Sequence, residues 1–195
     1  MRRQAIAGLL GGVILAQGAL AEEPSGDAEA GRAKAGICRT CHGLNGYAKM
    51  PLAPHIGGEN ALYIENQLHA FHDGTRVNEM MSVVAAGLDD EAIADLAAWY
   101  ASQQIEASLP PGTAADRAPE ACVDCHGANG VAVIEEAPNL AGENATYIRQ
   151  QLEAFRAGRR ASDVMQPIAA AMDDAAMREA ADWYASINLE IAPAP

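Results

Sequence analysis

The strongest constraint on this chain is an internal repeat with an offset of 84 residues. The pentad Cys38–His42 meets Cys122–His126 at this offset, and the agreement runs without a gap to Trp99–Ser102, which meets Trp183–Ser186. A period of this length indicates two whole domains and not a solenoid of short repeats. We therefore expect one structural unit to occur twice in the chain.

The boundary between the two units falls in a stretch rich in turn-forming residues. Pro110-Pro111-Gly112 is typical of a connection between domains. We expect a first domain over residues 22–107, a linker over residues 108–117 and a second domain over residues 118–195.

The hydrophobic pattern within each unit is helical. Apolar residues recur at i, i+4 and i+7 and stop at a glycine suited to a helix end, and an aspartate pair suited to N-capping precedes a second periodic stretch. The residues of these signals are Ile64, Leu68, Phe71 and Gly74 with Asp89-Asp90, and Ile148, Leu152, Phe155 and Gly158 with Asp173-Asp174. A third helix fits residues 27–36. No alternating pattern of a strand stands out, so we expect an all-α fold of two tandem domains.

All four cysteines lie in two C-x-x-C-H pentads, Cys38, Cys41 and His42 in the first and Cys122, Cys125 and His126 in the second. In this pentad two thiols attach covalently to a haem and the adjoining histidine becomes a ligand of its iron. Disulfides, redox-active thiol pairs and a zinc site are the alternatives. They leave unexplained why a histidine follows both pairs. The pattern predicts two covalently bound haem c groups, one in each domain, with His42 and His126 as proximal ligands.

The choice of residue for the second axial ligand of each iron can be narrowed by elimination. Beyond Gly127 the chain contains no histidine and no lysine, so methionine or an open position remains for the second haem. Only Met81 and Met165 meet at the repeat offset, which favours them as the iron ligands; the alternative is that both only fill the core. The other methionines Met50, Met80, Met172 and Met177 face Ile134, Val164, Leu88 and Ile93.

Other repeated residues suggest how the haem is supported. Pro54 and Pro138 form either a rigid turn or a carbonyl that accepts the second ring N–H of the haem histidine. Arg76 and Arg160 either bind a haem propionate or lie exposed after a helix.

Three further histidines have no counterpart in the second half of the chain. His55, His69 and His72 face Asn139, Glu153 and Arg156. We expect all three to be solvated residues and not iron ligands.

The first residues have the order of a secretory signal. Arg2 and Arg3 precede an apolar run, and Ala19-Leu20-Ala21 forms a small-residue cleavage site, so we expect residues 1–21 to be a signal peptide of an exported protein. The formal net charge of −13 disfavours nucleic acid as a partner. The charge either steers basic redox partners toward the chain or serves only solubility.

These residues resemble the class I cytochrome c fold, and the two-domain plan is similar to the dihaem cytochrome c4 family. The resemblance rests on both pentads, both prolines, the Ala-Phe-x-x-Gly-x-Arg segments that end at Arg76 and Arg160, and the methionines seven residues before Leu88 and Met172. It implies that Met81 and Met165 are the distal ligands. It also implies a periplasmic electron carrier between a quinol-oxidising complex and a terminal oxidase or another acceptor.

One departure from the family pattern concerns the second domain. Pro119 stands three residues before Cys122 and directly after the linker, so the helix ahead of the second pentad must be short. The usual packing of an N-terminal helix on the C-terminal helix is therefore in question there.

The leading function is electron transfer without catalysis. The alternatives are the cytochrome subunit of a flavocytochrome c sulfide dehydrogenase or another periplasmic dehydrogenase complex, and a haem enzyme with an open iron site. A structural zinc module is the remaining class.

Overall fold

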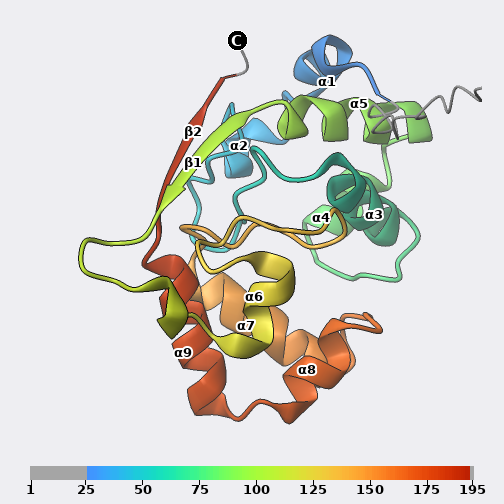
Figure 1. The fold of residues 1–195 in the computed structure, drawn as a ribbon. Helices are drawn as coiled ribbons and strands as arrows, with labels where there is room; N and C mark the ends of the chain where they lie inside the picture. Colours follow the sequence, from blue (N-terminus) through green and yellow to red (C-terminus); the bar gives the residue numbers. More distant parts are fainter. Residues whose placement is uncertain (1–25, 194–195) are drawn as a thin grey trace, which may run out of the picture.

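The computed structural model describes residues 26–193, so the predicted signal peptide lies outside the described residues. Among these residues no helix is long and apolar enough to cross a membrane. The chain forms two helical units, one above the other in Figure 1, joined at one side by a two-stranded ribbon.

The elements follow the repeat. The first unit contains α1 (Ala28–Lys34), α2 (Arg39–His42), α3 (Ala61–His72), α4 (Met81–Ala85), α5 (Asp90–Ala101) and β1 (Gln104–Ser108). The second contains the short 3-10 helix η1 (Ala115–Arg117), α6 (Glu120–His126), α7 (Ala145–Arg156), α8 (Met165–Ala171), α9 (Asp174–Ala185) and β2 (Asn188–Ala192).

The predicted helix ends are confirmed. Asp89 caps α5 by accepting from the N–H of Ala92, and Asp173 caps α9 by accepting from the N–H of Ala176 at the same 2.8 Å. Gly74 follows α3 with φ of 73° and Gly158 follows α7 with φ of 67°, a conformation that glycine adopts without strain. The same local signals therefore produce the same helices twice.

Each unit has its own apolar core where two long helices meet. Ile64 of α3 packs with Leu96 and Tyr100 of α5 in the first unit. Ile148 and Phe155 of α7 pack with Tyr184 of α9 in the second. The two cores are the protein frame on which both pentads are held.

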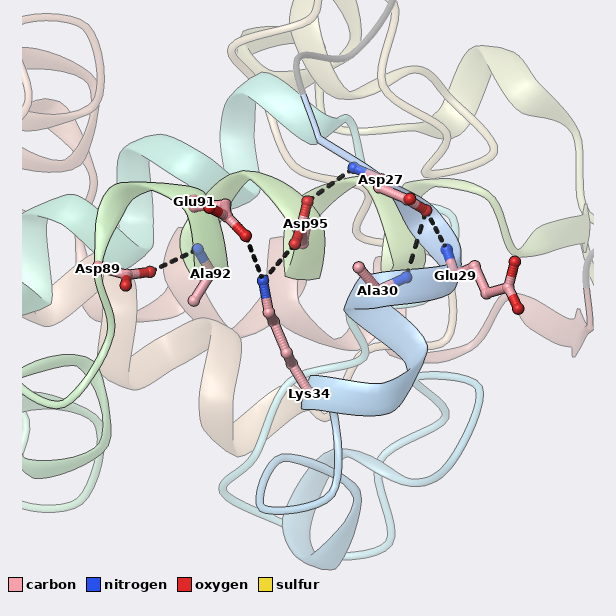
Figure 2. Close-up of polar contacts among 8 residues, drawn as sticks. All are labelled: Asp27, Glu29, Ala30, Lys34, Asp89, Glu91, Ala92 and Asp95. Carbon is pink, nitrogen blue, oxygen red and sulfur yellow. Dashed lines mark hydrogen bonds and ion pairs between the residues drawn. The ribbon is translucent and has the colours of Figure 1, made fainter.

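Helix α1 lies across α5 in the first unit. The Asp27 carboxylate caps α1 by accepting from the N–H groups of Glu29 and Ala30, and the Asp27 N–H donates to Asp95 of α5. At the other end of α1, Lys34 pairs with Asp95 (Figure 2). Polar contacts at both ends thus fix α1 on α5.

The second unit lacks this helix, as Pro119 led us to expect. Gly112 stands at the repeat position of Ala28, the first residue of α1, Pro111 stands in place of the N-cap Asp27, and Pro119 stands where Ala35 follows the helix. These residues disfavour a helix. Only the short 3-10 helix η1 forms in this stretch. Its last residue, Arg117, borders the α9 face that corresponds to the covered face of α5, and no described α-helix covers that face.

The expectation that no strand occurs is wrong for β1 and β2, which pair antiparallel with Ile105 opposite Ile191. Both strands alternate exposed and half-buried residues. The sequence signal was missed because five residues are few and the partner strand belongs to the other unit. A Cβ atom added to Gly57 of the first unit would lie 2.8 Å from the Ile191 side chain, so β2 packs onto the unit to which it does not belong.

The two units also exchange backbone contacts near an approximate two-fold axis. The Glu59 carboxylate accepts from the N–H of Asn139, and the Glu143 carboxylate accepts from the N–H of His55, both at 2.8 Å. Glu59 is 5% exposed and Glu143 is 4% exposed. Each unit therefore buries a carboxyl group that the other unit satisfies.

His55 is half-buried in this interface, and the expectation that it is solvated is wrong. Its Nδ1 accepts from the N–H of Ala48 at 2.9 Å, so its Nε2 carries the proton and lies 3.2 Å from the Gly142 carbonyl of the other unit. His69 and His72 lie on the solvent side of α3, with side chains 41% and 43% exposed, in agreement with the expectation for these two.

Asn139 makes the same two contacts from the second unit. Its Oδ1 accepts from the N–H of Ala132 at 2.9 Å, and its Nδ2 donates to the Gly58 carbonyl at 2.8 Å. A histidine and an asparagine thus occupy equivalent positions because each offers one acceptor and one donor.

This equivalence makes a testable prediction for His55. His55→Asn should retain both contacts and leave the free energy of unfolding nearly unchanged, whereas His55→Ala should lower it by about 1–3 kcal/mol because two backbone groups lose their partners. Denaturant unfolding of the holoprotein measures both. Equal losses in the two variants would contradict the assigned contacts.

Glu143 predicts a dependence of stability on pH. Burial raises its pKa from 4.5 to about 7, against the bonds donated by Asn144 and His55. Because the folded chain holds this proton to a higher pH than the unfolded chain, the stability it contributes is complete below about pH 4.5 and is lost as the pH rises through about 7.

Glu143→Gln should therefore flatten the fall in the free energy of unfolding between pH 5 and pH 8, since the amide cannot ionise. Denaturant titrations at several pH values measure the slope. Glu153→Gln, at an exposed position on α7, is the matched control and should keep the slope of the unmodified protein. Identical slopes in the Glu143 variant and the unmodified chain would refute the prediction.

Candidate haem attachment sites

The pentads occupy equivalent places in the two units. Cys41 and His42 lie on α2, and Cys125 and His126 end α6. Both helices stop at a glycine with positive φ, 78° at Gly43 and 68° at the repeat position in the second unit. The chain therefore turns away directly after each histidine.

Each haem histidine is held by a proline carbonyl, as one of the two sequence interpretations proposed. The Nδ1 of His42 lies 2.8 Å from the Pro54 carbonyl, and the Nδ1 of His126 lies 2.9 Å from the Pro138 carbonyl. A carbonyl only accepts, so Nδ1 carries the proton and Nε2 keeps its lone pair for a metal. Burial lowers the pKa of both histidines, which favours the neutral, metal-binding form.

The four cysteines are half-buried beside these histidines, and none of them forms a disulfide. Burial raises the pKa of Cys38 and of Cys122. Within residues 26–193, no three His, Cys, Asp or Glu side chains gather as ligands of a metal ion. Two thiols and one oriented imidazole at each pentad fit the covalent attachment of a haem.

Met81 and Met165 begin α4 and α8 at equivalent positions. The N–H of Met81 donates to Asn78 and that of Met165 donates to Ser162, each at 3.0 Å. Both methionines are half-buried, whereas Met80 is 62% exposed. The structure thus distinguishes the repeated methionine from its neighbour, and its role as an iron ligand stays a prediction.

Arg76 is a buried charge between the units. It is 9% exposed, and its guanidinium lies 4.4 Å from the centre of the Phe71 ring. Nη1 donates to Gln67 of its own unit at 2.6 Å, and Nη2 donates to Gln151 at 2.9 Å and Tyr147 at 3.2 Å of the other unit.

Arg160 repeats this arrangement from the second unit. It is 8% exposed, and it donates to Gln151 of its own unit and to Gln67 and Tyr63 of the first. The backbones of Arg76 and Arg160 also meet in an antiparallel bridge. The interpretation that these two arginines are exposed is therefore wrong.

These two guanidiniums fit a haem carboxylate. Their hydrogen-bond partners named above are neutral amides and phenols, although a buried charge is stable only with compensation. Haem carries two propionates, so a haem bound at each pentad would supply anions that the surrounding protein groups do not. The interpretation of Arg76 and Arg160 as propionate partners gains support from this chemistry.

Known proteins share this plan over most of the chain. No model of a protein family matches. Cytochrome c4 of Pseudomonas aeruginosa is 36% identical over 168 residues, which cover 77% of this chain and 83% of that protein. The chain belongs to the cytochrome c4 family.

The thiosulfate dehydrogenase electron acceptor of Thiomonas intermedia is 33% identical to this cytochrome, over 78% of this chain and 79% of that protein. The crystal structure of reduced recombinant cytochrome c4 from Pseudomonas stutzeri superposes with a TM-score of 0.74, at 26% identity over 84% of this chain and 100% of that one.

Membership in the cytochrome c4 family confirms the central predictions from the sequence. The chain is a dihaem electron-transfer cytochrome with two covalently bound haem c groups in tandem class I cytochrome c domains. Its pentads are Cys38–His42 and Cys122–His126.

The sequence analysis missed the polar residues that join the two haem domains. Gln67 and Gln151, and likewise Glu59 and Glu143, meet at the repeat offset. That pairing was the available signal. It was not enough, because polar residues on a helix or in a loop are most often solvated, and only the packing of one unit on the other buries these.

Proposed function

We propose that this chain shuttles single electrons between protein partners in the periplasm and catalyses no reaction of its own. Each haem, when bound, supplies an iron that alternates between the ferrous and the ferric state. The arrangement that carries the proposal is the doubled set of one carbonyl-held histidine and one half-buried methionine. Such a set could supply both axial ligands to each iron and would then leave no open position for a substrate.

The residues of the chain would hold the two centres in fixed surroundings. The Pro54 and Pro138 carbonyls keep the protons on Nδ1 of His42 and His126, so the iron-binding nitrogens stay unprotonated. Met81 and Met165 would complete the ligand sets and raise the reduction potentials relative to bis-histidine ligation. Arg76 and Arg160 would neutralise propionates between the units.

The chain is divided accordingly. We assign residues 1–21 to a signal peptide, residues 22–107 and 118–195 to the two haem domains and residues 108–117 to the linker. The signal peptide would deliver the chain to the periplasm, where thiols and haem are joined.

The net charge of the chain and one of its relatives suggest which proteins donate and accept its electrons. The strongly acidic chain would attract basic surfaces on a quinol-oxidising complex, a terminal oxidase or a dehydrogenase. The similarity to a thiosulfate dehydrogenase electron acceptor favours a sulfur-compound dehydrogenase as one donor. A second candidate follows from this relative: the chain is a permanent subunit of such a complex, as in a flavocytochrome c sulfide dehydrogenase. Isolation as a single species free of flavin would exclude it.

A spectroelectrochemical titration of the purified protein tests the electron-carrier proposal. Two one-electron transitions with haem c spectra are expected, and the reduced native protein should not bind carbon monoxide rapidly. Rapid binding would reveal an open iron site and overturn the assignment as a pure carrier.

The methionine ligands make a second prediction. Met81→Ala and Met165→Ala should each remove one near-infrared iron–sulfur band and lower one reduction potential, because a strong ligand is lost while both thioether links remain. Met80→Ala, next in the chain but unpaired in the repeat, is the control and should keep both bands. Both bands surviving in either ligand variant would reject that ligand.

A further inference from the structure

Helices α5 and α9 are two copies of one helix, but only α5 is covered. In α5, Asp95 and Ala98 are each 4% exposed and Trp99 is 8% exposed, because α1 lies over them. At the same repeat positions of α9, Glu179 and Asp182 are exposed and Trp183 is half-exposed.

The contact of α1 with α5 shows what kind of helix such a face accepts. A Cβ atom added to Gly31 would lie 1.9 Å from the carbonyl oxygen of Asp95, so a small residue is needed at the closest approach. Three residues later, Lys34 pairs with Asp95 and also with Glu91 at 3.3 Å (Figure 2). Between them, the Arg32 guanidinium lies 5.7 Å from the centre of the Trp99 ring.

The uncovered face of α9 keeps two of the partners that these residues contact on α5, while Ala175 replaces Glu91. Glu179 stands in place of Asp95, and Trp183 stands in place of Trp99. The face is hollowed, with a volume of about 480 Å³ bounded by Glu179, Asp182 and Trp183 on α9 and by Arg117 and Pro119 from the linker side. This face therefore has room beside α9 and two of the contacts that α1 makes on α5, and no described α-helix occupies it.

This face is directly connected to the second haem pentad. The Trp183 indole N–H donates to the Ala128 carbonyl at 3.0 Å, and the hydroxyl of the next residue, Tyr184, donates to the Gly127 carbonyl at 3.2 Å. Ala128 lies two residues beyond His126. A protein bound at Trp183 would therefore sit beside the loop that follows the second iron ligand.

Charge distinguishes between a second copy of this chain and a basic protein as the molecule that covers the α9 face. The hollow on this face is bounded by two carboxylates, Glu179 and Asp182, and by one arginine, Arg117. A second copy of this chain would bring a further net charge of −13, which opposes association, whereas a basic protein is attracted.

We propose that the α9 face is a docking site for a helix on a basic redox partner, which presents a small residue followed three positions later by lysine. This proposal rests on the proposed function, because the partner is taken to exchange electrons with the second haem. The docking itself can be measured without electron transfer.

The test uses a synthetic copy of the chain's own α1. The peptide comprises residues 26–36, and a hydrocarbon staple joins positions 29 and 33 to hold it helical. Both stapled positions are exposed on α1, so Gly31 and Lys34 remain available to contact the α9 face. Titrated into the reduced, isotope-labelled holoprotein, it should shift the Trp183 indole N–H resonance and saturate below about 1 mM. Trp99 is already covered by α1 and is the internal control, so its resonance should not move.

Two matched variants define the contact. Glu179→Lys should weaken peptide binding roughly tenfold, whereas Glu153→Lys, with the same charge change on α7, should not. A peptide with Gly31→Leu should bind weakly or not at all, because the larger residue blocks the close approach. An unmoved Trp183 resonance, equal binding of the two peptides, or dimerisation of the chain through Trp183 would each overturn the proposal. None of these outcomes would change the two redox transitions, so the electron-carrier assignment is tested separately.

Discussion

The burial of polar groups between the two units is the constraint on which this structure depends. Glu59 and Glu143 place carboxyl groups where only the backbone of the opposite unit can satisfy them, and Arg76 and Arg160 place guanidiniums between amides from both sides. Buried groups of this kind are costly when a partner is lost. Relative sliding of the units would break several contacts together, so the interface defines one arrangement of the two haem domains.

Much of this could be predicted from the sequence, because the relevant signals are local. Helix ends at Asp89 and Gly74 depend on residues next to them, and the pentads carry their chemistry within five residues. Because the unit is repeated, each of these local signals occurs twice in the chain. The carbonyl partners of His42 and His126 were one of two interpretations of Pro54 and Pro138, which recur at a fixed separation from the pentads.

The features that escaped prediction all depend on the opposite unit. Ile105 alternates with polar neighbours over too short a stretch to indicate a strand until Ile191 pairs with it. Arg76 has the sequence context of a solvated residue after a helix, and only the second unit covers it. His55 matches Asn139 in hydrogen-bonding capacity but not in residue type, so the comparison of the two halves hid their common role.

Strand β2 joins the end of the second unit to the first unit. It is the last element of the described chain, yet it lies along β1 and packs against Gly57 of the first unit (Figure 1). Part of the contact surface of the first unit is therefore supplied by residues that follow all the helices of the second unit in the sequence. A chain truncated before Asn188 would keep the helices of both units but lose the ribbon that joins them.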